Sequence, residues 1–107
     1  MVIKRDGRAE EYSREKLLSG IKKACQKRPV SAKVIEELTD SVMDQVMQKY
    51  DSEVPSMAIG ERVMEGLKRV DQVAYVRYAS VYRGFQEAND FLNEVKRLEE
   101  QGDSTSQ

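Results

Sequence analysis

Cationic side chains gather near the start of the chain, in the stretch VIKRDGRAEEYSREK. Among its charged residues we single out Glu10 and the cations near it, Lys4, Arg5, Arg8 and Lys16. Ammonium and guanidinium groups, together with backbone N–H donors, bind phosphate through charge-assisted hydrogen bonds. A carboxylate beside phosphates costs energy, so Glu10 is better suited to accept hydrogen bonds from ribose hydroxyls. The cluster predicts a nucleoside triphosphate site, with a solvated charged hairpin as the alternative that composition alone favours.

Several other chemistries lack the residues that they need. The chain has no histidine, which excludes a histidine base, a histidine metal ligand and a Ser-His-Asp triad. Cys25 is the single cysteine, so neither an intrachain disulfide nor a zinc site of several thiolates can form within this sequence. Gly-x-x-x-x-Gly-Lys and Gly-x-Gly-x-x-Gly loops are also missing. We therefore expect no enzyme and no zinc in this chain, and any phosphate must be bound in another way.

The cationic stretch must be positioned by a β-hairpin, which we expect over residues 2–12. Val2 and Ile3 favour a strand, and Asp6-Gly7 is a strong turn signal because glycine tolerates positive φ. A two-residue turn would place Arg5 directly opposite Arg8, and like charges opposed across a hairpin destabilise it. Either the loop is wider than that, or an anion lies between the two side chains.

Helices follow the hairpin, each with an N-cap candidate. Ser13 precedes a helix over 14–27 that Pro29 ends, and Ser31 precedes a helix over 32–49. Apolar side chains recur at helical spacing in both. In the first helix these are Leu17, Leu18, Ile21, Ala24 and Cys25, and in the second Ile35, Leu38, Val42, Val46 and Met47.

Further elements complete the predicted architecture. Val54 precedes a proline and so must be extended, which allows a short third strand. Ser56 is expected to cap a helix that ends near Lys68, and Asp71 a fourth helix that Gly84 breaks. The last helix, over 86–100, carries a stripe at positions 88, 91, 95 and 98 that resembles a partner-binding face.

These elements predict an α+β fold, a small β-hairpin-based sheet packed against four or five helices. We divide it into a nucleotide-binding unit at 1–85, a C-terminal amphipathic helix at 86–101 and a disordered tail at 102–107. No apolar run is long enough to cross a membrane, and with no signal peptide before Val2 we expect a cytoplasmic protein. The net charge of −1 argues against general nucleic-acid binding.

The pattern V-x-K-R-D-G-R…E-x-x-S-x-x-K-L resembles the opening of the ATP-cone, a domain that binds ATP or dATP at the front of many ribonucleotide reductases. KKACQKRPVS, EVPSMAIGERVMEGLKRVD and VAYVRYASVYRGF are similar to the ATP-cone of the repressor of bacterial ribonucleotide reductase genes. The last of these stretches favours the repressor over the reductase subunits. The resemblance covers the chain from Val2 to about Phe91.

The resemblance assigns roles to residues of this chain. Val2 and Lys4 would lie along the base and phosphates, Arg5 would pair with phosphate, and Lys16 would reach the phosphates from the first helix. Glu10 would meet the ribose. Two residues of the fourth helix would close the pocket, Arg77 and Tyr82. Asp6 and Gly7 are expected to form the turn.

The resemblance also implies cofactors and partners. ATP or dATP, accompanied by Mg²⁺, would change the oligomeric state of a homo-oligomer formed through the helices from Val73 to Leu98. That repressor carries a four-cysteine zinc ribbon before its ATP-cone, and this sequence begins directly on the ATP-cone. We therefore expect DNA binding only if the intact protein has such a ribbon. The rival hypotheses are a ligand-free helical dimerisation module and an independent DNA-binding domain.

Overall fold

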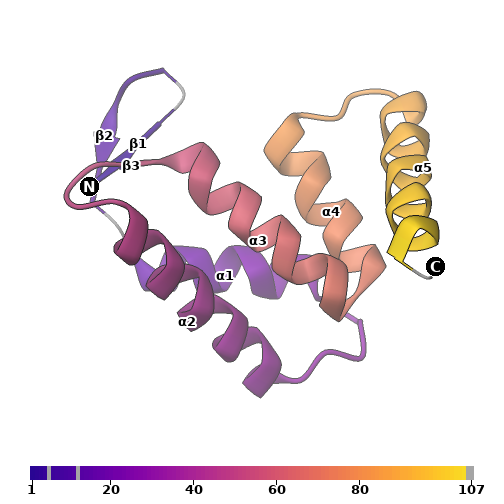
Figure 1. Cartoon of the computed structure of the whole chain (residues 1–107), viewed down its shortest axis with the longest axis horizontal. Coiled ribbons are helices and arrows are strands. Elements are labelled where there is room, and N and C mark those ends of the chain that lie inside the picture. Colours follow the sequence, from indigo (N-terminus) through magenta and orange to yellow (C-terminus); the bar gives the residue numbers. More distant parts are fainter. Residues whose placement is uncertain (5, 12, 106–107) are drawn as a thin grey trace.

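A small sheet lies at one end of a set of helices in the computed structural model of the chain (Figure 1). The structure describes residues 1–4, 6–11 and 13–105, of which 101–105 are described as backbone only. This arrangement confirms the predicted α+β fold. The elements, in chain order, are β1 (Val2–Ile3), β2 (Ala9–Glu10), α1 (Arg14–Ala24), α2 (Ala32–Lys49), β3 (Val54–Pro55), α3 (Ser56–Val70), α4 (Gln72–Arg83) and α5 (Ala88–Thr105).

The sheet has the strand order β2-β1-β3, with β1 in the centre. β1 runs antiparallel to β2, where Val2 lies opposite Glu10, and parallel to β3, where it lies opposite Val54. The backbone N–H of Val54 donates to the carbonyl of Met1 at 2.8 Å. The third strand predicted at Val54 is therefore confirmed.

Local sequence signals set most helix ends. The hydroxyl of Ser13 accepts from the N–H of Lys16, and that of Ser31 accepts from the N–H of Val34. At the start of α4 the Asp71 carboxylate accepts from the N–H of Ala74 at 2.9 Å. Gly84 ends α4 with φ 66°, the left-handed conformation that glycine adopts most easily. All four predicted signals are confirmed.

The predicted end of α1 and the predicted start of α3 are wrong. α1 stops at Ala24 rather than at residue 27, because the chain turns through Cys25 to Arg28, with Lys27 in the left-handed region at φ 60°. Ser56 is the first residue of α3 rather than its cap: extended Pro55 precedes it, pairs with β1 through β3, and offers no side-chain hydrogen bond. Tertiary pairing therefore overrides the serine signal.

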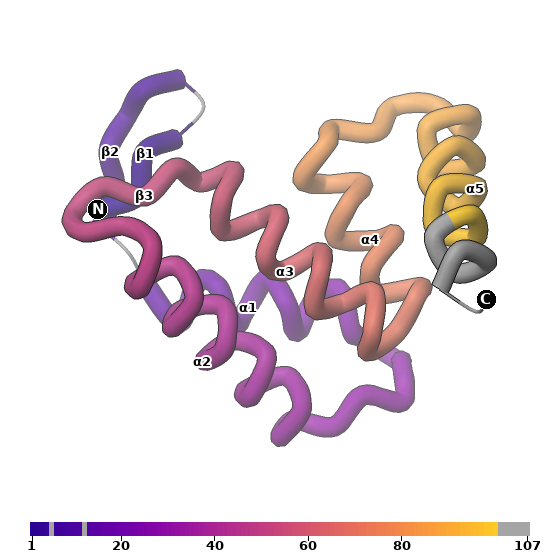
Figure 2. The backbone as a smooth tube through the Cα atoms, in the orientation of Figure 1, coloured from indigo at the N-terminus to yellow at the C-terminus, as the bar shows by residue number. Residues whose placement is uncertain are grey.

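The core lies where α3 passes between α2 and α4, with α1 alongside α2 and α4 (Figure 2). Its central side chains are completely buried and come from three helices: Ile21, Val63, Leu67, Ala74 and Ala79. Cys25 is buried among them, as expected for a small core residue. Met47, predicted to belong to the core stripe of α2, is instead 67% exposed.

The C-terminal helix packs against α4, and part of its predicted stripe remains exposed. Leu98 is buried in the core and Phe91 packs edge-on against Phe85, whereas Leu92 and Val95 are exposed. Within the predicted stripe only Leu98 is buried, whereas Phe91 and Val95 are 41% and 38% exposed. α5 begins two residues later than expected, and its backbone continues through Thr105, into the predicted tail. Residues 106–107 lie outside the described residues.

Candidate functional site

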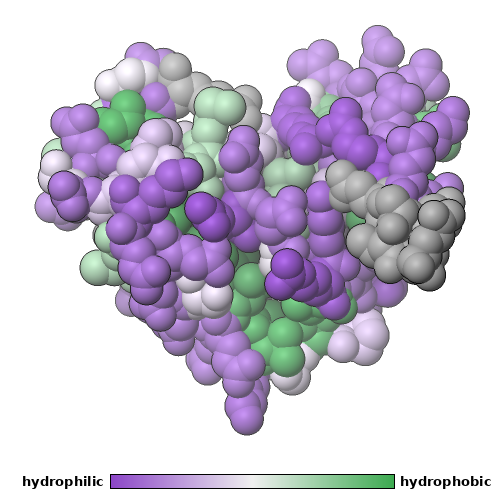
Figure 3. All heavy atoms as spheres, viewed as in Figure 1, coloured by the Kyte–Doolittle hydropathy of each residue, from purple (hydrophilic) through white to green (hydrophobic). Residues whose placement is uncertain are grey.

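A pocket of about 820 Å³ opens between the hairpin, α1, the start of α3 and the end of α4. The space-filling view shows the molecule hollowed between the hairpin and the α4–α5 end (Figure 3). Six of the seven predicted site residues line this pocket: Val2, Lys4, Glu10, Lys16, Arg77 and Tyr82. Arg5, the seventh, lies outside the described residues. The fold thus brings together side chains that are up to 80 positions apart in the sequence.

The hairpin places apolar, basic and acidic side chains on the same face. Side chains alternate along a strand, so Val2 and Lys4 of one strand point the same way as Arg8 and Glu10 of the other. All four line the pocket. Val2 is buried at 8% exposure, which leaves the charged ends of the other three to face the pocket.

The hairpin loop is wider than a two-residue turn. The backbone N–H of Lys4 donates to the carbonyl of Arg8 at 2.7 Å. The residue opposite Arg8 is therefore Lys4, and not Arg5 as a two-residue turn would require. Gly7 has φ 88° and donates its N–H to the carbonyl of Lys4, which confirms the predicted turn. The carboxylate of Asp6 accepts from both the backbone N–H and the Nε of Arg8, at 3.0 and 2.6 Å. The first of the two alternatives, a wider loop, therefore holds.

Glu10 lies between two cations at this end of the pocket. Its carboxylate is 3.4 Å from the Nζ of Lys4 and 3.8 Å from the Nζ of Lys16. The three side chains are 38%, 42% and 75% exposed respectively. Long, exposed ion pairs of this kind contribute little stability, so an incoming anion can replace Glu10 as a partner of either lysine.

The walls of the pocket that come from α1, α3 and α4 carry apolar side chains beside polar ones such as Lys23 and Ser56. Leu17 and Ile59 are buried there, whereas Val81 is 84% exposed. Tyr82 donates its hydroxyl hydrogen to the carbonyl of Met57 at 3.1 Å. Sequence reasoning missed Ile59 and Val81 as pocket residues because both fit an ordinary apolar helix stripe. The pocket therefore offers charged groups at the hairpin and apolar side chains on the helices.

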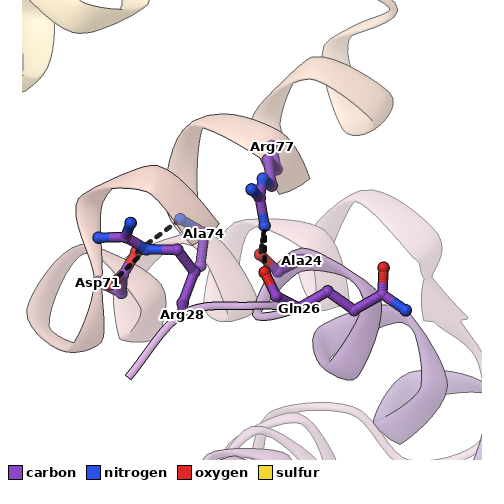
Figure 4. Close-up of polar contacts among 6 residues, drawn as sticks. All are labelled: Ala24, Gln26, Arg28, Asp71, Ala74 and Arg77. Atoms are coloured by element: carbon purple, nitrogen blue, oxygen red, sulfur yellow. Dashed lines mark hydrogen bonds and ion pairs between the residues drawn. The ribbon is translucent and has the colours of Figure 1, made fainter. Parts of the chain in front are cut away.

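Arg77 reaches from α4 to the end of α1. Its Nη1 donates to the carbonyls of Ala24 and Gln26, at 3.3 and 2.7 Å (Figure 4). These carbonyls lie at the C-terminal end of α1, where cations are favoured. The contact satisfies carbonyls at the end of α1, which lies at Ala24 rather than at the predicted residue 27.

A second polar contact joins the same two segments. The Nε of Arg28 donates to both carboxylate oxygens of Asp71, at 3.0 and 3.1 Å (Figure 4). The hydrogen bond from the Ala74 N–H, assisted by Arg28, lowers the pKa of Asp71 below its usual value. Burial, assisted by the charge of Asp71, raises the pKa of the nearby Cys25 thiol. These contacts hold α1 against α4 and so hold two walls of the pocket together.

Among the described residues, no three histidine, cysteine, aspartate or glutamate side chains are grouped closely enough to hold a metal ion. None of the helices in the described ranges is long and apolar enough to span a membrane.

Comparison with known proteins identifies the family. The profile of the ATP cone domain matches residues 1–88. The transcriptional repressor NrdR of Symbiobacterium thermophilum is 53% identical over 98 residues, which cover 92% of this chain and 65% of the relative. NrdR of a Thermoanaerobacter species is 53% identical over 98 residues, 92% of this chain and 62% of the relative.

A third relative matches the whole chain. NrdR of Caldanaerobacter subterraneus subsp. tengcongensis is 50% identical over 107 residues, which make up 100% of this chain and 68% of the relative. The chain spans less than two thirds of the length of the first two relatives. The resemblance inferred from the sequence is confirmed: the chain belongs to the ATP-cone family and is similar to the ATP-cone region of the NrdR repressors.

Proposed function

We propose that this chain is a regulatory domain that binds ATP or dATP in the pocket and changes its oligomeric state in response. In a repressor of ribonucleotide reductase genes, that change would control binding to operator DNA. The relatives are named as transcriptional repressors, not as enzymes. A regulator of this kind would act in the cytoplasm, where bacterial DNA lies.

The meeting of Lys4 and Lys16 at Glu10, on the rim of a pocket that also carries apolar side chains, is the observation that carries the proposal. Lys4, Lys16 and Arg5 would bind the phosphates, and Glu10, released from the lysines, would accept hydrogen bonds from the ribose. The volume of about 820 Å³ falls within the range of roughly 300–1,000 Å³ that is common for small-molecule sites. The charge pattern therefore fits a nucleotide.

Mg²⁺ would accompany the bound triphosphate. This ion usually keeps several waters and binds phosphate oxygens with few protein ligands. It would neutralise part of the phosphate charge beside Glu10 and so allow the carboxylate to remain close to the ligand. Chelation of Mg²⁺ is then expected to weaken triphosphate binding.

The C-terminal helices supply the proposed interface between copies of the chain. Leu92 and Val95 are 55% and 38% exposed on α5, and Val81 is exposed near the end of α4. Val81 also lines the pocket, so one residue touches both the proposed ligand and the proposed interface. A ligand shifts an assembly equilibrium only if it binds the two assemblies with different affinity. Val81 would produce such a difference if its side chain contacts the ligand in one assembly and the neighbouring copy in the other.

Calorimetric titration of ATP and dATP into the purified chain, at low salt with Mg²⁺, tests the binding step. We expect saturable heat at micromolar to millimolar nucleotide, which falls when Mg²⁺ is chelated. Absence of heat for both nucleotides would contradict the proposal.

Light scattering with and without nucleotide tests the response. A change in molar mass supports the proposal, whereas one unchanged oligomer supports a ligand-free helical dimerisation module. Steeply salt-dependent binding of this chain alone to duplex DNA would support an independent DNA-binding domain instead. We propose that DNA binding needs a zinc ribbon elsewhere in the intact protein.

A further inference from the structure

Two glycines of the pocket face tyrosine rings of α4, but at very different separations. A Cβ atom added at Gly60 in α3 would lie 2.7 Å from Cε2 and 2.8 Å from Cδ2 of Tyr82. One added at Gly20 in α1 would lie 3.9 Å from Cε2 of Tyr78, an ordinary van der Waals contact. Only at Gly60 does a missing side chain decide where the neighbouring ring can lie.

The Tyr82 side chain is held at both of its ends against α3. Its ring lies on the backbone of Gly60, and its hydroxyl donates to the carbonyl of Met57, nearly one turn earlier in α3. A methyl group at position 60 would force the ring away from α3 or stretch this hydrogen bond. Because both residues line the pocket, either movement changes the shape of the pocket wall.

Helix propensity does not explain a glycine at this position. Glycine inside a helix is less favourable than alanine, so a contact must compensate for it. Gly66, the other glycine of α3, has such a contact on the side of α2, where an added Cβ would lie 2.2 Å from Leu38. Gly60 faces the pocket instead, and the contact that it makes possible is that of the Tyr82 ring.

We propose that Gly60 is a positioning residue of the nucleotide pocket: its bare backbone lets the Tyr82 ring lie close against α3 and form a wall for the aromatic base. This inference rests on the proposed function for the identity of the ligand. The contact between Gly60 and Tyr82 stands independently of it. Aromatic rings pack well against flat bases when their orientation is fixed.

Calorimetric titration of ATP into Gly60→Ala tests the positioning role, with Lys33→Ala as a control at an exposed position of α2 outside the pocket. We expect Gly60→Ala to weaken binding by ~10-fold or more, Gly20→Ala, whose added methyl meets no ring closely, to weaken it less, and Lys33→Ala to leave it unchanged. Equal binding by Gly60→Ala and the unmodified chain would overturn the inference.

A double variant separates positioning from general damage. With Tyr82→Ala as the background, the added methyl at position 60 has no ring to displace, so Gly60→Ala should cause little further loss of affinity. A loss as large as in the unmodified background would overturn the role assigned to Gly60. The double variant also keeps the test decisive if Gly60→Ala alone fails to fold, because folding rescued by Tyr82→Ala demonstrates the same clash and folding that is not rescued contradicts it.

NMR of the chain with ¹³C-labelled tyrosine, without nucleotide, distinguishes the two proposals. Gly60→Ala should move the Tyr82 ring signals, and Gly20→Ala should leave them in place. Unmoved Tyr82 signals would contradict the contact even if ATP binds. Moved signals in a chain that binds no nucleotide would contradict the proposed function and leave the Gly60–Tyr82 contact standing.

Discussion

Two charged clusters of the molecule are built in opposite ways. At the hairpin, Glu10 is 38% exposed and meets Lys4 and Lys16 at 3.4 and 3.8 Å. Between α4 and α5, Glu94 is 2% exposed and accepts from the hydroxyl of Tyr75 and the Nη1 of Arg83, both at 2.5 Å. The first cluster is open and loosely paired, whereas the second is closed and tightly paired.

This difference in burial indicates which charged side chains can exchange their present partner for a ligand. Water already surrounds the hairpin lysines, so replacing Glu10 by another anion costs little free energy. Removing Glu94 would leave the hydroxyl of Tyr75 buried without its acceptor, which is unfavourable. Burial, followed by the Glu94 carboxylate, raises the pKa of Tyr75, so this hydroxyl remains a donor at all ordinary pH values. The hairpin cluster suits ligand binding, and the Glu94 cluster ties α5 to α4.

The largest expected effect is on stability, at the closed cluster. Glu94→Ala should lower the free energy of unfolding by about 2–4 kcal/mol, because a buried carboxylate is lost from Tyr75 and Arg83. This range is discounted from that of a fully buried pair because Arg83 is 34% exposed and can regain water. Urea denaturation followed by circular dichroism measures the change.

A matched control for this change lies on the exposed side of the same helix. Glu99→Ala should alter the free energy of unfolding by no more than ~0.5 kcal/mol, as surface substitutions do. Similar stability of the two variants would mean that Glu94 is not the tie between α4 and α5, and the comparison of the clusters would fail.

The next effect is on binding, at the open cluster. Lys4→Ala and Arg5→Ala should each weaken ATP binding by ~1.5–3 kcal/mol, because a charged hydrogen bond to phosphate is lost. The free energy of unfolding should hardly change for Lys4→Ala, since its ion pair is long and exposed. Calorimetric titration measures the affinity.

Lys33→Ala supplies the control for these variants, because Lys33 is 85% exposed in α2 and does not line the pocket. Its affinity for ATP should equal that of the unmodified chain. If neither Lys4→Ala nor Arg5→Ala alters the affinity, the phosphates must bind elsewhere, and the open cluster is a solvated hairpin.

The smallest effect is expected on the pH dependence of stability, at Asp71. Its carboxylate side chain is buried like that of Glu94, and its partner Arg28 is partly exposed. The folded pKa of Asp71 lies below its unfolded value, so its contribution to stability is complete above the unfolded value of about 3.9 and is lost as the pH falls through the folded pKa. The free energy of unfolding should therefore decline below about pH 4. Asp71→Asn, which retains a helix cap, should make this decline shallower in urea titrations from pH 7 to pH 3. An unchanged decline would exclude Asp71 as a source.

Much of the fold could be predicted because its signals are local. The caps at Ser13, Ser31 and Asp71 and the stop at Gly84 depend on atoms within four residues of each other. The identity of the family followed from the hairpin stretch together with later motifs.

Contacts between distant residues could not be predicted in this way. Arg77, which lies 53 positions beyond Ala24, donates to the carbonyl of that residue at the end of α1. In the sequence Glu94 resembles a surface residue of an amphipathic helix, and it is not part of the stripe predicted at positions 88, 91, 95 and 98. Only the packing of α5 on α4 shows that this carboxylate faces Tyr75.

The sequence by itself determined the family, the order of the elements and the residue types of the charged hairpin, because these depend on neighbours along the chain. Only the tertiary structure decided which charges are open to a ligand and which are buried, and why Gly60 must lack a side chain. The physical reason is that burial and clashes are set by residues from other helices, whose approach no local pattern records.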